Sequence, residues 1–194
     1  MIWRLLERAE THQRFMDGVV LIGNPPFLPT GYGKQLKLMG EYLSSKYEVL
    51  HISDFGYDLN QFEYNSVTVA PVCPSKAERE EGLTNSHINE TVNRWLSQKS
   101  IDRWVMIALG DLHKWGDLFA EFPSAVIGPV DRETLTEREI ETLRQSIPVA
   151  MSLFGQNVMV RNGLQGAFYL PHVADKVSIP KSKAAIRSTR HWPI

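Results

Sequence analysis

The stretch Val19-Val20-Leu21-Ile22-Gly23 decides the fold, because a short continuous apolar run indicates a strand buried on both faces of a sheet. A Pro-rich loop follows over residues 24–33, and apolar residues then recur at helical spacing as far as Tyr47. Residues 48–52 form a second buried run. Together these segments predict a βαβ unit, whose two strands are parallel.

The same alternation of strand and helix patterns continues along the chain. Further strands are predicted at 66–70, 104–109, 125–128, 148–152 and 167–170. Further helices are predicted at 86–100, after Thr136, and at 154–162, with Gly163 ending the last. Buried strands that alternate with helices predict the α/β class, with a Rossmann-like parallel sheet and helices on both faces.

The helix after Thr136 has a recognisable start. Thr136 and Glu139 have the spacing of a capping box. Ile140, Leu143 and Ile147 are the predicted buried stripe of this helix.

The chain divides into three predicted parts. Residues 18–179 form the Rossmann-like domain, and residues 1–17 have the pattern of an N-terminal amphipathic helix. Residues 180–194 are interpreted as a linker or as the truncated start of a second domain.

Composition excludes several classes of protein. The 21 Lys and Arg against 22 Asp and Glu leave a net charge of −1, so no general attraction to nucleic acid is expected. The single cysteine, Cys73, cannot form an internal disulfide, and no stretch has the length of a signal peptide or a transmembrane segment. We therefore predict a cytoplasmic protein.

Candidate site residues follow the predicted strands, because ligands of open parallel sheets bind beyond the carboxyl ends of the strands. Asp111 and His113 follow strand 104–109, and Asp131 follows strand 125–128. A histidine there suits general-base catalysis or a hydrogen bond to a hydroxyl, and a carboxylate suits orienting a hydroxyl. The alternatives are that Asp111 caps a helix, that Asp131 caps a turn and that His113 faces solvent.

The glycine loop Gly31-Tyr32-Gly33 leaves two interpretations open. Glycines at a helix start let backbone N–H groups approach an anion such as a diphosphate, or they simply permit a tight entry into the helix. The spacing fits neither a dinucleotide fingerprint nor a Walker loop. Asp54 stands where a ribose-binding acid would sit, so an NAD-dependent oxidoreductase remains an alternative. No motif predicts a metal site.

Several segments in order match one known pattern. They are Pro29–Gly33 with its helix and Tyr47-Glu48-Val49, then Pro129-Val130-Asp131, then Val149–Gln156, and finally Gly163-Leu164 with Tyr169–Asp175 and Pro180. In this order they resemble the N-terminal, acceptor-side domain of GT-B-fold retaining glycosyltransferases of the family-four type. The glycine that the family has after its hinge histidine is missing here, where Val173 and Ala174 follow His172.

The resemblance implies a part in the transfer of a sugar from a nucleotide-diphosphate sugar to an acceptor hydroxyl, a hexosyltransferase-type reaction that needs no cofactor besides the donor substrate and no metal. The implied partners are the nucleotide sugar, an acceptor glycan or small molecule, and a second Rossmann domain or protein subunit without which the chain would be inactive. The implied site comprises Asp111 and His113 as catalytic residues, Gly31, Tyr32 and Gly33 at the donor phosphate, Asp131 at the acceptor, and His172 and Asp175 at the hinge. A stand-alone protein- or anion-binding module without catalysis is the alternative.

Overall fold

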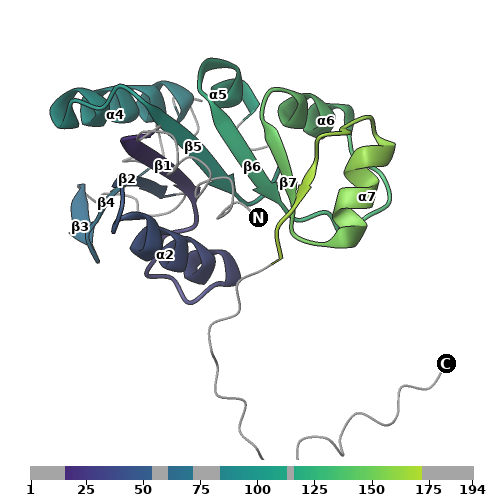
Figure 1. Ribbon diagram of the computed structural model, residues 1–194, viewed down its shortest axis with the longest axis horizontal. Helices are drawn as coiled ribbons and strands as arrows, with labels where there is room; N and C mark the ends of the chain where they lie inside the picture. The colour runs from purple at the N-terminus through teal and green to yellow at the C-terminus, as the bar shows by residue number, and fades with distance from the viewer. Residues whose placement is uncertain (1–15, 54–60, 72–83, 113–115, 172–194) are drawn as a thin grey trace, which may run out of the picture.

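The computed structural model describes residues 16–53, 61–71, 84–112 and 116–171, which form an eight-stranded sheet with helices packed on it (Figure 1). The described strands are β1 (Gly18–Gly23), β2 (Glu48–Ser53), β3 (Phe62–Tyr64), β4 (Val67–Pro71), β5 (Trp104–Leu109), β6 (Ser124–Gly128), β7 (Ile147–Ala150) and β8 (Phe168–Tyr169). The described helices are α2 (Gly31–Leu43), α4 (Thr84–Lys99), α5 (Gly116–Glu121), α6 (Glu137–Arg144) and α7 (Leu153–Arg161).

The sheet has the order β3-β4-β2-β1-β5-β6-β7-β8. All neighbouring pairs are parallel except β3 and β4. β1 pairs with β2 on one side and with β5 on the other, so the chain changes direction across the sheet at β1. This arrangement confirms the predicted α/β class with a Rossmann-like sheet.

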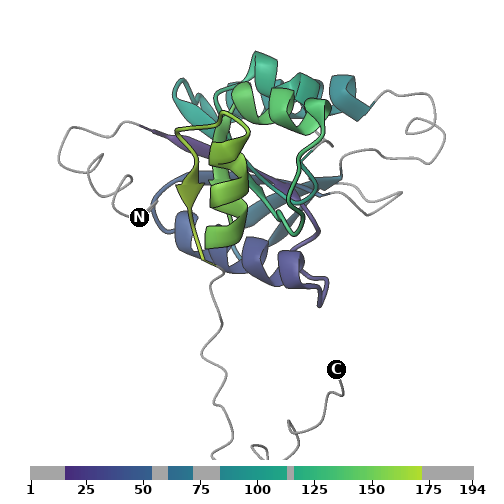
Figure 2. The ribbon, with the colours of Figure 1, turned by 90° about the vertical axis from the view of Figure 1, so that its right-hand side faces the viewer.

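The two faces of β1 belong to two different cores, as expected where successive side chains of a strand point to opposite faces. Val19 and Leu21 pack with Leu36 and Leu43 of α2. The other face of the sheet packs against α4, α5, α6 and α7 (Figures 1 and 2). Helices therefore cover both faces, as the sequence predicts.

The structure corrects the sequence-based prediction at the start of β7. α6 ends at Arg144, and Ile147 is the first residue of β7 with half of its surface exposed, so it is not part of the buried stripe of α6. The strand thus begins one residue before the predicted 148. Leu143 is fully buried as predicted, and the capping box of Thr136 and Glu139 is present.

Two elements lie where the sequence predicted none. β3 is a three-residue antiparallel strand at the sheet edge, and Asn65 and Ser66 connect it to β4 with positive φ angles of 50° and 63°. Such a pair is typical of a tight hairpin turn. α5 is a six-residue helix between β5 and β6.

Some predictions concern residues beyond these ranges. Of the predicted helix 1–17 only residues 16 and 17 are described, and the segment 180–194 lies outside the described residues. Within the described ranges, no helix combines the length and the apolar character needed to cross a membrane.

Candidate functional site

The carboxyl ends of the parallel strands lie along one edge of the sheet, and the strand order reverses between β1 and β5. Gly23 ends β1 opposite Leu109 of β5 with a φ of 148°. A Cβ atom at Gly23 would lie 2.5 Å from the Leu109 carbonyl oxygen and 2.9 Å from Leu36 Cδ1. The close approach of two strands and a helix therefore requires glycine here.

The loop after β1 is held by the cap of α2. The Thr30 hydroxyl accepts hydrogen bonds from the Gly33 amide at 3.0 Å and from the Asn24 side-chain amide at 3.1 Å. The amides of Gly31 and Tyr32 have no hydrogen-bond partner among the described residues. Two N–H donors therefore remain at this helix start.

The two glycines of this loop have different surroundings. A Cβ at Gly33 would lie 2.6 Å from the Leu28 carbonyl oxygen and 2.8 Å from that of Pro25, whereas a Cβ at Gly31 would meet nothing within 4 Å. Gly33 therefore serves the tight entry into the helix. Only Gly31 faces open space, as contact with a ligand would require.

A solvent-open hollow of about 530 Å³ lies between the loops that follow β5 and β6. We call it the β5–β6 hollow, and its lining consists of Asp111, Leu112, Pro129, Val130, Asp131, Arg132, Leu135 and Glu139. Leu112 packs directly on the end of β6, since a Cβ at Gly128 would lie 1.8 Å from Leu112 Cδ2. This contact brings the predicted site residues Asp111 and Asp131 to one hollow.

Tyr32 is electrostatically linked to both carboxylates of the hollow. Partial burial raises the pKa of Tyr32 above its ordinary value, and the negative charges of Asp111 and then Asp131 raise it further. The loops after β5 and β6 therefore place both carboxylates close enough to the first turn of α2 to act on the Tyr32 hydroxyl. The two carboxylates suit a ligand with hydroxyl groups, which can donate hydrogen bonds to them.

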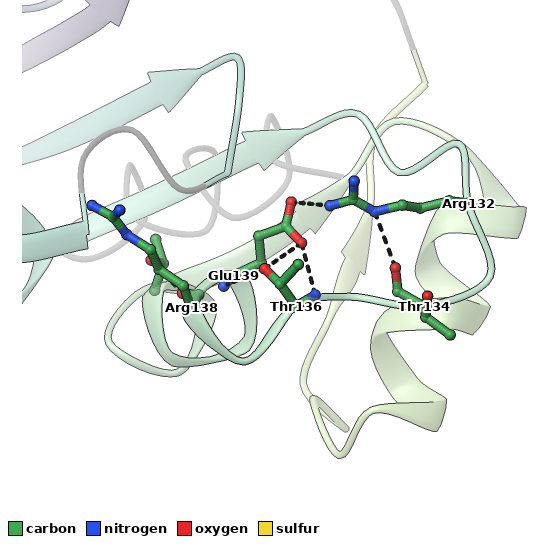
Figure 3. Close-up of polar contacts among 6 residues, drawn as sticks. Arg132, Thr134, Thr136, Arg138 and Glu139 are labelled. Carbon is green, nitrogen blue, oxygen red and sulfur yellow. Dashed lines mark hydrogen bonds and ion pairs between the residues drawn. The ribbon is translucent and has the colours of Figure 1, made fainter.

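An ion pair between the half-exposed Arg132 and the buried Glu139, both of which line the hollow, was not anticipated from the sequence (Figure 3). The Glu139 side chain is 7% exposed and forms a salt bridge with the Arg132 guanidinium. Its Oε2 atom accepts hydrogen bonds from the backbone amide and the hydroxyl of Thr136, each at 2.8 Å. Arg132 Nε donates to the Thr134 carbonyl oxygen at 3.1 Å.

The Glu139 carboxylate stays ionised because of these contacts. Burial alone would raise the pKa of Glu139, but the hydrogen bonds from Thr136 and the hydrogen bond and charge of Arg132 outweigh burial and hold the pKa below its ordinary value. The sequence signal was the capping box, which explained Glu139 without reference to Arg132.

Other predicted site residues remain unplaced. His113, His172 and Asp175 lie outside the described residues, as does Asp54 of the oxidoreductase alternative. Among the residues that are described, no group of three or more His, Cys, Asp or Glu side chains is arranged to hold a metal ion.

Comparisons of the chain with protein-family models, with curated proteins and with solved structures found no match.

Proposed function

We propose that the chain contributes the acceptor-binding domain of a GT-B-type glycosyltransferase, which transfers a sugar from a nucleotide-diphosphate sugar to an acceptor hydroxyl. The observation that carries the proposal is the β5–β6 hollow, because Asp111 and Asp131 line it at the carboxyl edge of a parallel sheet. Exposed carboxylates accept hydrogen bonds from hydroxyl groups, which are what an acceptor sugar offers.

The proposed roles follow from this placement. Asp111 and Asp131 orient the acceptor hydroxyls, and the free amides of Gly31 and Tyr32 face the donor phosphate. The Gly33 amide takes no part in this proposed contact, since Thr30 already accepts its hydrogen bond. A second Rossmann domain or subunit holds the nucleotide sugar, and the reaction relies on positioning and on stabilising the leaving phosphates.

A titration of the full chain tests the proposal. Simple methyl hexosides, myo-inositol, UDP-glucose and NAD are added separately to ¹⁵N-labelled protein, and amide shifts and thermal stabilisation are recorded. We expect the polyols to shift the amides of 111–112 and 130–135. The Asp111→Asn/Asp131→Asn double variant should lose this response, whereas Asp102→Asn, an exposed carboxylate before β5 at the opposite edge of the sheet, should retain it.

Two outcomes contradict the proposal. A response to NAD without any response to polyols favours the oxidoreductase alternative. A protein that responds to none of the four probes is not an acceptor-binding domain of this kind, and the stand-alone module without catalysis then becomes the better description.

A further inference from the structure

Arg132 is held in a fixed position at the wall of the β5–β6 hollow. Glu139 binds one terminal nitrogen of its guanidinium, and the Thr134 carbonyl oxygen binds Nε (Figure 3). Two anchors on one planar group fix the orientation of the remaining N–H donors before any ligand arrives. Such fixation lowers the entropic cost of binding.

The Arg132 guanidinium keeps free donors despite these two anchors. Its Nη1 group has no hydrogen-bond partner among the described residues, and 53% of the side chain is exposed. Guanidinium has five N–H donors, of which the two contacts use one each. The remaining donors are therefore available to a ligand in the hollow.

The charges of the lining define which ligand fits. Asp111, Asp131 and Glu139 bring three carboxylates to the lining of the hollow, and Arg132 is the only basic side chain among the described lining residues. The surplus of two negative charges opposes a phosphate or carboxylate ligand. A neutral hydroxyl group avoids this repulsion, since it donates to a carboxylate and accepts from a guanidinium at the same time.

We infer that Arg132 is a ligand-binding residue of this hollow and that, together with Asp131, it selects an uncharged polyol with neighbouring hydroxyl groups. Glu139 is a positioning residue that acts through Arg132. The inference rests on the proposed function and deepens it, because it names the class of acceptor and a residue that the resemblance does not supply.

The test measures how tightly variants of the full chain bind methyl hexosides and myo-inositol, with amide shifts as the readout. Arg132→Gln should raise the Kd about tenfold, the loss expected for one hydrogen bond to a charged group. Arg132→Lys should not restore binding, because an ammonium group cannot reproduce the fork that meets Thr134 and Glu139 together. Arg103→Gln is the matched control, and this variant should bind the polyols as tightly as wild type. Arg103 precedes β5 and forms an exposed ion pair with Asp17, which precedes β1.

Variants of Glu139 separate its positioning of Arg132 from its role as a helix cap. Glutamine also completes a capping box, so Glu139→Gln should leave the melting temperature nearly unchanged while it raises the Kd severalfold. Glu139→Ala should lower the melting temperature as well. A Glu139→Gln variant that binds the polyols as tightly as wild type would overturn the positioning role.

The remaining outcomes distinguish this inference from the proposed function. Wild-type affinity in Arg132→Gln, with binding lost in Asp131→Asn, overturns the role of Arg132 and leaves the acceptor site standing. Inorganic phosphate that binds in the hollow more tightly than the polyols overturns the uncharged class of ligand. A wild-type protein that binds no polyol overturns the proposed function, and this inference falls with it.

Discussion

Protonation of one buried histidine should make the folded protein sensitive to acid. His51 lies on β2 with no exposed surface, and neither ring nitrogen has a hydrogen-bond partner among the described residues. A small hollow, with room for about one water molecule, borders the ring, and the ionisable side chains around this hollow are Lys37, Glu41 and Tyr64. Burial lowers the pKa of His51 to about 4, although the backbone of Gly23 and Asn24 opposes the shift.

The size of the effect follows from the two pKa values of this imidazole. The ordinary value of 6.5 applies to the unfolded chain and the value of about 4 to the folded one. The unfolded chain therefore binds the proton more tightly, and stability is lost as the pH falls from 6.5 to 4. The full loss is about 3 kcal/mol, of which about 2 kcal/mol arises between pH 7.5 and pH 5.

Urea unfolding at several pH values measures this loss directly. Trp95 is almost fully buried, so its fluorescence reports the transition. His51→Leu removes the proton-binding group from a largely apolar site, and His51→Gln is a second neutral variant should leucine pack poorly. Both should lose about 2 kcal/mol less than wild type between pH 7.5 and pH 5.

The matched control is His87→Gln on α4, a partly exposed histidine, which should keep the pH dependence of wild type. The reasoning fails if wild type and the His51 variants lose equal stability over this range. That result would mean that the imidazole protonates inside the folded protein at no cost, through water or a partner that the described residues do not provide.

Three further sets of substitutions test the packing and capping around the site. Gly33→Ala should lower the free energy of unfolding by about 1–3 kcal/mol, because the new Cβ contacts loop carbonyls. Gly31→Ala places its Cβ in open space and should leave the urea midpoint unchanged or slightly raised. Equal effects of the two substitutions would contradict the assignment of the tight helix entry to Gly33. Gly128→Ala should be similarly destabilising by its contact with Leu112, and Leu112→Ala in the same chain should recover part of the loss, so additive effects would refute that contact. Glu139→Ala should cost about 1–2 kcal/mol in thermal or urea unfolding, and Glu139→Gln clearly less; equal losses would show that the cap has no part in stability.

The sequence predicts the fold well where burial dominates. β1, β2, β5 and β6 are mainly apolar strands and the sheet buries most of their residues, so a local pattern suffices to find them. β3 escapes this reasoning, because an antiparallel strand of three residues depends on its pairing with β4 rather than on its own composition.

The position of Ile147 shows a second limit of local patterns. Its spacing from Leu143 suits a helix, yet the Gln145 cap ends α6, and Ile147 instead pairs with Ala125 of β6. Helix spacing alone cannot reveal that α6 ends at Arg144 and that the chain soon afterwards pairs with β6 as a strand.

The sequence likewise predicts one part of the candidate site and leaves another part open. The rule that ligands bind at the carboxyl ends of parallel strands places Asp111 and Asp131 near each other without any knowledge of contacts. The different surroundings of Gly31 and Gly33 depend on where the carbonyl groups of Leu28 and Pro25 point. Sequence alone therefore cannot separate the two glycines, and the fold assigns the tight helix entry to Gly33.

The capping role of Glu139 explains why no sequence pattern points to its ion pair with Arg132. A capping box gives a glutamate at this position a complete local role, and Arg132 lies seven residues earlier in an irregular loop, where no helical or strand spacing connects the two. The box needs only one carboxylate oxygen, since Oε2 alone meets both Thr136 groups. The other oxygen remains for Arg132, so the start of α6 fixes a guanidinium at the hollow with a residue that the helix requires in any case.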